Sequence, residues 1–335
     1  MRHLILRLAG PMRRVLILGG TGWLGRDIAR AAIAEGAEVT ALARGESGAV
    51  SDGVRLVRAD RSQPGAYDAL AGDWDEIIEL AVEPGLVGPA LDALAAHAAH
   101  WTLVSSVSVY ENNTTPLADE SAAVVEPLDL ARYADAKVAA ERVSRTRLGD
   151  RLLIARPGLI VGPGDPSDRF GYWPARLHRG GRAVIPAAEG RYVQAIDVAD
   201  LAGWIERAGR AHLVGVVNAV GAIHPLDGFF RELSAATRFR GELVSVDDAA
   251  LLASGVQYWA GPRSLPLWLP LSDAAFAQRD GSVYLASGGT LRPLRETLAR
   301  TLEDEIARGV DRPRRSGLTP DEESVVLERR LGTGR

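Results

Sequence analysis

The sequence predicts an α/β fold, with a doubly wound parallel sheet and a smaller, interleaved C-terminal portion. Two features of the first half of the chain support this. Short apolar runs alternate with alanine-rich segments of helical periodicity, and a glycine-rich turn at 19–25 separates the first apolar run from the first helical segment. Strands that alternate with helices pair in parallel, because each helix carries the chain back to the edge at which the previous strand began.

Each expected strand is a compact run of apolar residues bounded by turn formers. The runs lie at 14–18, 39–42, 54–57, 76–80, 102–105 and 152–155, with one more at 214–218. Helical periodicity marks 23–35 and 85–97 in the first half, and 291–306 and 321–331 near the end. Between these two late helices we expect the basic stretch 308–317 to be a solvent-exposed linker.

Composition argues against several classes of protein. The 335 residues carry a formal net charge of -4 and no cysteine, which excludes a disulfide scaffold and a thiolate metal site and gives no basic field for nucleic acid. No uncharged run reaches the ~18 residues that a membrane helix needs. Among the six histidines only His97 and His100 have a metal-ligand spacing, and we expect both to be solvated at a helix end. We therefore expect a cytoplasmic protein without a metal, nucleic-acid or membrane partner.

The glycine turn suits the binding of a dinucleotide. It follows a strand and opens a helix, and this context makes a glycine pattern informative. Glycines let the main chain approach a pyrophosphate, which then lies at the positive N-terminus of the helix. An ordinary glycine-rich turn is the alternative. The candidate cofactor contacts in the turn are Gly19, Thr21, Gly22, Trp23, Leu24 and Gly25.

Ala43 and Arg44 follow the second expected strand, where proteins that prefer NAD usually place an acidic residue against the ribose hydroxyls. An arginine there can bind a 2′-phosphate, so the sequence favours NADP(H) over NAD(H), unless Arg44 is an ordinary surface residue. Asp60 follows the third strand and is placed to bind the adenine amino group or to cap the next helix.

Ser106, Tyr133 and Lys137 form a candidate catalytic set. Tyr133 and Lys137 are four residues apart in an expected helix, so they share one face of it. An ammonium near a phenol favours the phenolate, which suits the tyrosine as an acid or base toward a carbonyl or carbinol. Ser106 ends an apolar strand and can hold the same oxygen. Each feature alone is common, but their order behind the glycine turn makes the combined interpretation stronger.

These features together resemble the short-chain dehydrogenase/reductase superfamily, and within it the extended branch, the NAD-dependent epimerase/dehydratase family. The similarity covers nearly the whole chain from Met12. Its motifs are the glycine turn, the strand end Ser105-Ser106-Val107-Ser108-Val109-Tyr110, the segment Tyr133-Ala134-Asp135-Ala136-Lys137, the run from Arg156-Pro157-Gly158 to Gly162-Pro163-Gly164, and Ile196-Asp197-Val198-Ala199-Asp200-Leu201.

The resemblance implies a role for each of these positions. Tyr133 would be the catalytic acid/base, Lys137 would bind the nicotinamide ribose and lower the pKa of Tyr133, and Ser106 would hold the substrate oxygen. Further cofactor contacts would come from Leu80, Ala81 and Val82, and, beside the nicotinamide, from Pro157, Gly158 and Ile160. The resemblance also implies a homodimer formed through paired helices, as is typical of the family.

The resemblance also divides the chain. We expect a Rossmann NAD(P)-binding domain over 12–165, completed by 194–220, and a substrate-binding portion made of 166–193 and 221–331. Residues 1–11 precede the second methionine and are interpreted as an N-terminal extension.

Two departures from the family pattern argue against a nucleotide-sugar substrate. The stretch between Leu80 and Ser106 is short, and Val193 and Gln194 stand where an arginine is expected. The tentative substrate contacts are Arg169, Tyr172 and Trp173, after a Gly/Pro loop, and Arg263, which could bind an anion or be structural.

The leading hypothesis is therefore an NAD(P)-dependent reductase or dehydrogenase that acts on a small carbonyl or alcohol. An epimerase or dehydratase that retains its cofactor is the alternative within the enzyme class. A non-catalytic dinucleotide sensor or an RNA-binding protein is a third interpretation, and the intact Ser/Tyr/Lys set and the acidic net charge argue against it.

Overall fold

The structure, a computed structural model, describes residues 12–81 and 83–332. The expected extension 1–11 and the candidate contact Val82 lie outside the described residues. The chain forms two compact units that alternate along the sequence. The first comprises the residues up to Ser105, Glu126–Ala155 and Ala202–Val216, and the second comprises Ser106–Val125, Arg156–Leu201 and the residues from Val217 onward.

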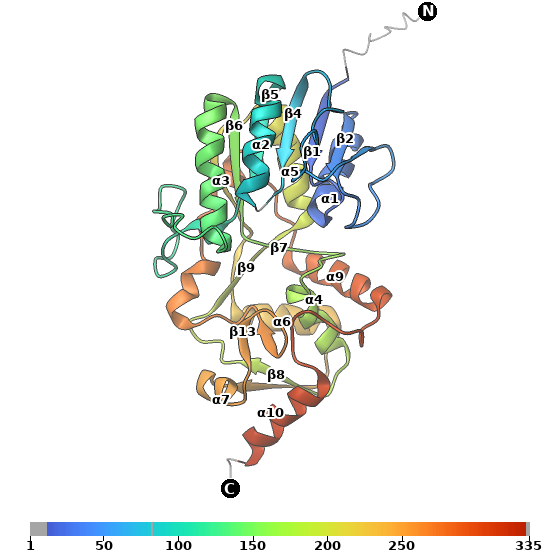
Figure 1. The fold of residues 1–335 in the computed structure, drawn as a ribbon. Helices are drawn as coiled ribbons and strands as arrows, with labels where there is room; N and C mark the ends of the chain where they lie inside the picture. Colours follow the sequence, from blue (N-terminus) through green and yellow to red (C-terminus); the bar gives the residue numbers. More distant parts are fainter. Residues whose placement is uncertain (1–11, 82, 333–335) are drawn as a thin grey trace, which may run out of the picture. The chain divides into compact units, whose positions relative to one another are not determined.

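A seven-stranded sheet is the framework of the first unit, in the order β10-β6-β5-β4-β1-β2-β3 (Figure 1). The pairs from β6 to β3 are all parallel. The strands are β1 (Arg14–Leu18), β2 (Glu38–Ala43), β3 (Arg55–Arg58), β4 (Trp74–Glu79), β5 (Ala98–Val104), β6 (Leu152–Pro157) and β10 (Gly215–Ala219). The predicted parallel α/β fold is confirmed, and each predicted strand overlaps an observed one, with bounds that agree within two residues except at the start of β5.

Helices cover both faces of this sheet. They are α1 (Trp23–Ala34), α2 (Pro84–Leu94), α3 (Tyr133–Leu148) and α5 (Val198–Arg210). Apolar residues of α2 and α3 share one core cluster with Leu16, Ile77 and Leu103 of the strands. On the other face, α5 comes so close that a Cβ atom at Gly209 would lie 2.0 Å from the carboxylate of Glu76 in β4. Figure 1 shows α2 and α3 in front of the sheet and α5 behind it.

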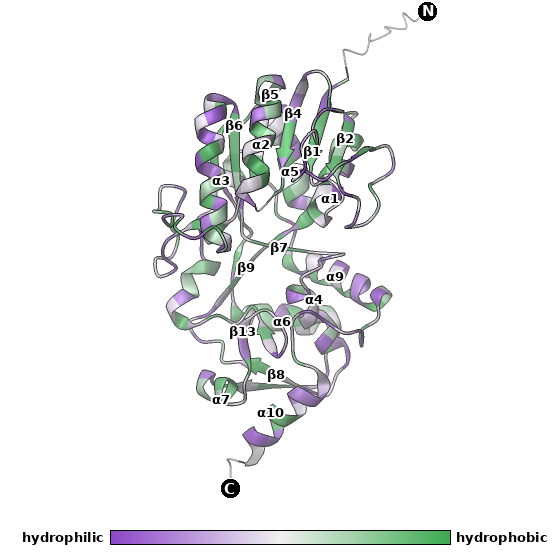
Figure 2. Cartoon of the chain, in the orientation of Figure 1, coloured by the Kyte–Doolittle hydropathy of each residue, from purple (hydrophilic) through white to green (hydrophobic). Residues whose placement is uncertain are grey.

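The pattern of hydropathy explains this layering. Figure 2 shows apolar residues along the strands, whereas α3 alternates between apolar and polar positions. A parallel sheet buries both of its faces, so its strands are nearly continuous apolar runs, while each helix buries only one stripe.

His100 corrects one expectation from the sequence. It lies in β5, is fully buried, and its Nε2 is 2.8 Å from the carbonyl oxygen of Leu213. It was expected to be solvated, and this is wrong because β5 begins at Ala98, four residues earlier than the apolar run that predicted the strand. His97, in contrast, is half exposed and pairs with Asp73 at 3.0 Å.

The second unit contains smaller sheets. Strands β7 (Leu159–Val161), β9 (Tyr192–Asp197) and β11 (Ile223–Pro225) form a three-stranded sheet in the order β11-β9-β7. Two further pairs join β8 (Arg182–Pro186) to β12 (Glu242–Val246) and β13 (Gln257–Trp259) to β14 (Ser264–Pro266). Its own helices are α4 (Arg169–His178), α6 (Leu226–Thr237), α7 (Asp248–Ala253), α8 (Ser282–Ala286), α9 (Leu294–Arg308) and α10 (Pro320–Gly332).

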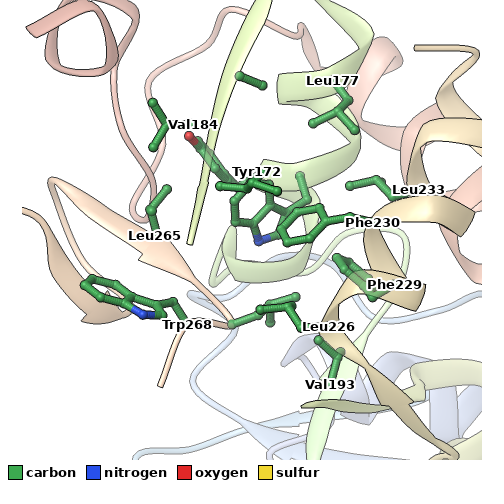
Figure 3. Close-up of a cluster of buried hydrophobic side chains, with 14 of the residues drawn as sticks. Tyr172, Leu177, Val184, Val193, Leu226, Phe229, Phe230, Leu233, Leu265 and Trp268 are labelled. Carbon is green, nitrogen blue, oxygen red and sulfur yellow. The ribbon is translucent and has the colours of Figure 1, made fainter. Parts of the chain in front are cut away.

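Aromatic side chains fill the core of the second unit. Figure 3 shows Tyr172 of α4 beside Val184, with Phe229 and Phe230 of α6 on the opposite side of the cluster and Trp268 below Leu265. The ring of Trp173 meets Phe230 edge-on, with 4.8 Å between the ring centres. This geometry is favourable for aromatic pairs and fixes α4 against α6.

The basic stretch 308–317 is not the solvent-exposed linker that the sequence predicted. Glu305 of α9 is buried and accepts from Arg314 at 2.6 Å and from Arg312 at 3.0 Å. Arg312 also forms an ion pair with the buried carboxylate of Asp168. The prediction was wrong because the acidic partners lie far away in the sequence or on the preceding helix, and only folding brings them to the arginines.

Candidate functional site

The glycine turn brings the main chain close to the start of α1. Gly19 has a φ of +98°, in the left-handed region that favours glycine. A Cβ atom at Gly20 would lie 2.6 Å from the Cβ of Ala41, and one at Gly25 would lie 2.7 Å from the carbonyl oxygen of Gly19. A side chain at either position would push the turn away from the sheet or the helix. The turn therefore keeps the amides at the N-terminus of α1 open to an anion.

A cavity of about 500 Å³, which we call the nucleotide pocket, opens beside this turn. It lies where β1, β2 and β4 end, which is where ligands bind in open parallel sheets. The structure gathers around it the predicted cofactor contacts Gly19, Thr21, Gly22, Trp23, Leu24, Gly25, Arg44, Asp60, Leu80 and Ala81.

Arg44 and Asp60 occupy different environments in the nucleotide pocket. The side chain of Arg44 is 61% exposed and forms an ion pair with Glu46 at 3.2 Å. Asp60 accepts hydrogen bonds from the main chain and the hydroxyl of Ser62, at 3.0 and 2.7 Å, and these bonds lower the pKa of its carboxyl. Asp60 is thus a fixed acceptor at the rim, whereas Arg44 has an exposed partner from which it can be released.

Lys137 of α3 is bonded to two residues that line the same pocket, Ala81 and Val104. Its side chain is buried, and Nζ donates to the carbonyl oxygen of Ala81 at 2.9 Å and to that of Val104 at 2.7 Å. The ring of Tyr133, one turn earlier, is 6.0 Å from Nζ, and Tyr133 is 47% exposed. The helix therefore presents a reachable phenol above a buried ammonium.

Burial lowers the pKa of Lys137 to about 8, because the charged form loses its hydration. The carboxylates of Glu79 and Glu141 oppose this effect. An ammonium with this pKa is close to its point of titration near neutral pH, so small changes around it alter its charge.

The remaining predicted residues of the main site belong to the second unit. Ser106 is buried, and its hydroxyl accepts from the amide of Ser108 at 3.1 Å, at the start of the 3-10 helix Val107–Val109. Pro157 ends β6, the amide of Gly158 donates to Ala219 at 3.3 Å, and Ile160 pairs with Ile196 between β7 and β9.

Comparison with known sequences identifies the family. The sequence model of the NAD dependent epimerase/dehydratase family matches residues 15–217. The chain belongs to this family. The predicted resemblance is therefore confirmed, and the family carries the NAD-binding Rossmann fold described above.

Individual relatives of the family include a reductase and several epimerases. The chain is 30% identical over 234 residues to the 2'-dehydrokanamycin reductase of Streptomyces kanamyceticus. That match covers 66% of this chain and 64% of the reductase, so the chain spans less than two thirds of that relative.

Solved structures share the fold at low identity. The UDP-N-acetylglucosamine 4-epimerase of Bacillus cereus has a TM-score of 0.68 at 16% identity, covering 90% of this chain and 98% of its own. The UDP-glucuronic acid 4-epimerase of Bacillus cereus, in complex with NAD, has a TM-score of 0.67 at 13% identity, covering 88% and 99%.

The cationic residues of the chain are almost all of one kind. Lys137 is its single lysine, and the other 38 of its 39 lysine and arginine residues are arginines. Lys137 was predicted from its spacing to Tyr133 and not from its being the single lysine. Arginine stays charged under all ordinary conditions, whereas an ammonium can titrate when buried. The one lysine is the residue that the sequence predicted as part of the catalytic set.

The tentative substrate contacts do not share one environment. Tyr172 and Trp173 lie in the aromatic core, and the indole of Trp173 donates to the carbonyl of Pro266 at 2.8 Å. Their complete burial leaves no surface for a substrate, so this expectation is corrected. Arg169 lies 5.2 Å from the ring centre of Trp259. Arg263 donates to the carbonyl oxygen of Ser254, at 2.9 Å from Nη2, which favours the structural interpretation.

Two residues at the nucleotide pocket were missed by sequence analysis. Arg61 lines the pocket next to Asp60, and both of its Nη atoms donate to the carboxylate of Glu79, the last residue of β4. The available signal was a carboxylate that ends an otherwise apolar strand, Glu76-Ile77-Ile78-Glu79. Such a residue is buried with the strand and needs a cation.

Residues 12–81 and 83–332 were searched for metal-binding groups and for membrane-spanning helices. No group of three or more His, Cys, Asp or Glu side chains in these ranges could hold a metal ion. None of the helices in the same ranges is both long and apolar enough to span a bilayer.

Proposed function

We propose that this chain is an NAD(P)-dependent oxidoreductase that interconverts a small carbonyl compound and its alcohol. The observation that carries the proposal is Lys137. It is the single lysine of the chain, it is buried, and its Nζ donates to the carbonyl oxygens of Ala81 and Val104, two residues that line the nucleotide pocket. The relative that is named a reductase supports the same class of reaction.

The residues of the first unit fit a dinucleotide. The pyrophosphate would lie against the glycine turn and the N-terminus of α1, the adenine amino group against Asp60, and the nicotinamide ribose against Lys137. A bound nicotinamide cofactor supplies or accepts the hydride. Nζ has three N–H donors, and two of them bind the main-chain oxygens of Ala81 and Val104. The third can donate to a ribose hydroxyl.

Tyr133 is the proposed acid/base. In reduction its hydroxyl gives a proton to the carbonyl oxygen, and in oxidation the phenolate takes that proton back. The positive charge of Lys137 stabilises the phenolate formed in reduction. Ser106 is proposed to hold the substrate oxygen because of its place in the family motif.

NADP(H) is the proposed preference. Arg44 is exposed at the mouth of the nucleotide pocket and its ion pair with Glu46 is a surface pair, which contributes little and is easily exchanged. A 2′-phosphate offers a guanidinium more charge and more acceptors than one carboxylate does. Ala43 leaves the end of β2 without an acidic group for the ribose.

A nucleotide-sugar epimerase is the second candidate, because it is the activity named for several relatives of the same fold. The second unit weighs against it. Gln194 holds the main chain, donating to Gly221 and Arg279 at 3.0 and 2.8 Å. Arg191, the nearest arginine in sequence, is buried and forms an ion pair with Asp248 at 2.5 Å. Neither side chain is available to a diphosphate.

A cofactor assay tests the proposal directly. The purified chain is incubated with NADPH or NADH and a panel of small ketones and aldehydes, and cofactor oxidation is followed by absorbance. Lys137→Arg should abolish turnover, because a larger, planar guanidinium does not fit between the two carbonyl oxygens that hold Nζ. Arg145→Lys, an exposed position on the same helix, is the matched control and should not matter. Turnover that survives Lys137→Arg contradicts the proposal.

A further inference from the structure

Glu79 is a buried carboxylate at the end of β4, and its environment is unusually well ordered by hydrogen bonds. It has no exposed surface. Its Oε1 accepts from the amide of Ala81 at 2.8 Å and from Nη1 of Arg61 at 2.9 Å, and its Oε2 accepts from Nη2 of Arg61. A carboxylate buried to this degree stays ionised only when it is paired in this way.

Arg61 is in turn fixed by neutral partners. Its Nη2 donates to the carbonyl oxygen of Leu86 at 3.0 Å, and its Nε donates to the hydroxyl of Tyr67 at 3.2 Å. The guanidinium therefore has no freedom to follow a moving carboxylate, and Glu79 is held in one position.

Ala81 connects this pair to Lys137. Its amide is held by Glu79, and its carbonyl oxygen, one peptide unit on, accepts from Nζ of Lys137 at 2.9 Å. The carboxylate thus sets the position of the main chain that orients the ammonium.

Titratable groups from two elements surround Lys137. Two carboxylates act on it, Glu79 from β4 and Glu141 from its own helix, and Glu141 accepts from the hydroxyl of Ser105 at 2.6 Å. On α3 itself, Tyr133 and the buried Asp135 also lie within about one turn of Lys137, and Asp135 accepts from the amides of Leu128 and Asp129 at 3.0 and 2.9 Å. Asp92 of α2 pairs with Arg147 at the far end of α3.

We propose that Glu79 is a positioning residue for Lys137: its carboxylate, clamped by Arg61, fixes the Ala81 main chain and supplies the negative charge that keeps the ammonium protonated. The inference rests on the catalytic role proposed for Lys137. Arg61 lines the nucleotide pocket beside Asp60, the residue proposed to bind adenine. The hydrogen bonds from Arg61 to Glu79, from the Ala81 amide to Glu79 and from Lys137 to the Ala81 carbonyl therefore connect that side of the pocket to the lysine.

The single lysine makes a direct test possible. Protein labelled with 13C-lysine gives one side-chain ε-carbon signal, which reports the titration of Lys137 without any need for activity. The cofactor-free chain is titrated as wild type, Glu79→Gln and Glu79→Leu. Glutamine keeps an oxygen for the Ala81 amide but loses the charge, and leucine loses both.

The proposal expects the midpoint of Lys137 to fall by on the order of one pH unit in both variants, since a nearby opposite charge is lost. Exchange of the Ala81 amide with solvent should accelerate only in Glu79→Leu. Glu141→Gln is the matched control: it also removes a carboxylate near Lys137, but it should leave the Ala81 amide unchanged. In turnover assays, the alkaline limb of the pH–rate profile of Glu79→Gln should move to lower pH by the same amount.

A double variant covers the case in which a single substitution does not fold. Arg61→Met with Glu79→Leu replaces the ion pair by apolar groups of similar volume, a change that proteins often tolerate. Because it removes a positive charge together with the negative one, it should lower the midpoint of Lys137 by less than Glu79→Gln does. An unchanged midpoint in the folded variants overturns the inference, even if Tyr133→Phe is inactive. If Tyr133→Phe instead remains active, the proposed function fails, while a shifted midpoint still supports the link between Glu79 and Lys137.

Discussion

Exposed polar groups at the nucleotide pocket of the first unit contrast with a buried ion-pair network in the second. In the first unit, Arg44 is exposed at the nucleotide pocket and Tyr133 presents a reachable phenol. In the second unit, the buried carboxylates of Asp168 and Glu305 are matched to arginines of the same unit, such as Arg312. Arg44 and Tyr133 are exposed and can contact a ligand. The carboxylates of Asp168 and Glu305 already form ion pairs in the folded second unit.

This difference predicts that substitutions of the exposed groups change function and that substitutions in the buried network change stability. An exposed or half-exposed group can be altered without loss of packing, so its removal is felt in binding or turnover. Removal of one member of a buried ion-pair network leaves its partners charged and desolvated, so the folded state itself is weakened.

Tyr133→Phe should show the largest effect on function. Only the proton-transferring oxygen is lost, and removal of a general acid/base typically costs ~10²–10⁴-fold in kcat. Because Tyr133 is 47% exposed, the melting temperature should stay within a few degrees of wild type. Steady-state kinetics and thermal unfolding measure both. Near-normal turnover would show that the acid/base lies elsewhere.

Glu305→Ala should show the largest effect on stability. The variant leaves Arg312 and Arg314 without their shared carboxylate, and breaking a buried ion pair typically lowers the free energy of unfolding by about 3–5 kcal/mol. Urea unfolding measures it, with Glu303→Ala, an exposed position of the same helix, as control. Equal stability of the two variants would contradict the contrast between the units.

Lys137 predicts a pH dependence of stability. Burial lowers its folded pKa to about 8, from an ordinary value of 10.5. Between these values the unfolded chain binds a proton that the folded chain has released, so stability rises with pH. The free energy of unfolding of wild type relative to Lys137→Met should rise by roughly 1.4 kcal/mol per pH unit across this window. A flat difference would mean that Lys137 is not desolvated.

Arg44→Ala should show the smallest effect. Loss of charge-assisted bonds to a 2′-phosphate should weaken NADPH binding by roughly 10- to 100-fold and leave NADH binding unchanged. Stability should not change, because the side chain is exposed. Calorimetric titration of both cofactors measures the ratio, and equal losses for NADPH and NADH would remove the basis for the proposed preference.

The sequence alone was sufficient for the framework of the first unit. The run 14–18 coincides with β1, and the helical periodicity at 23–35 matches α1 to within one residue. These signals are local, because alternation of apolar runs with helical periodicity depends on neighbours a few residues apart. The same holds for the pairing of Tyr133 with Lys137, since an i, i+4 spacing on a helix is itself a statement about geometry.

The tertiary structure decided what surrounds those residues. No local pattern joins Arg61 to Glu79, Glu305 to Arg314, or the carbonyl oxygen of Ala81 to Lys137, because each partner comes from a different element or loop. Burial likewise decided that Tyr172 and Trp173 belong to the core rather than to a pocket. The sequence by itself determined the fold class and the chemical identity of the candidate site, because both follow from short-range spacing. Which charges face that site depends on contacts between distant segments, and these exist only once the chain has folded.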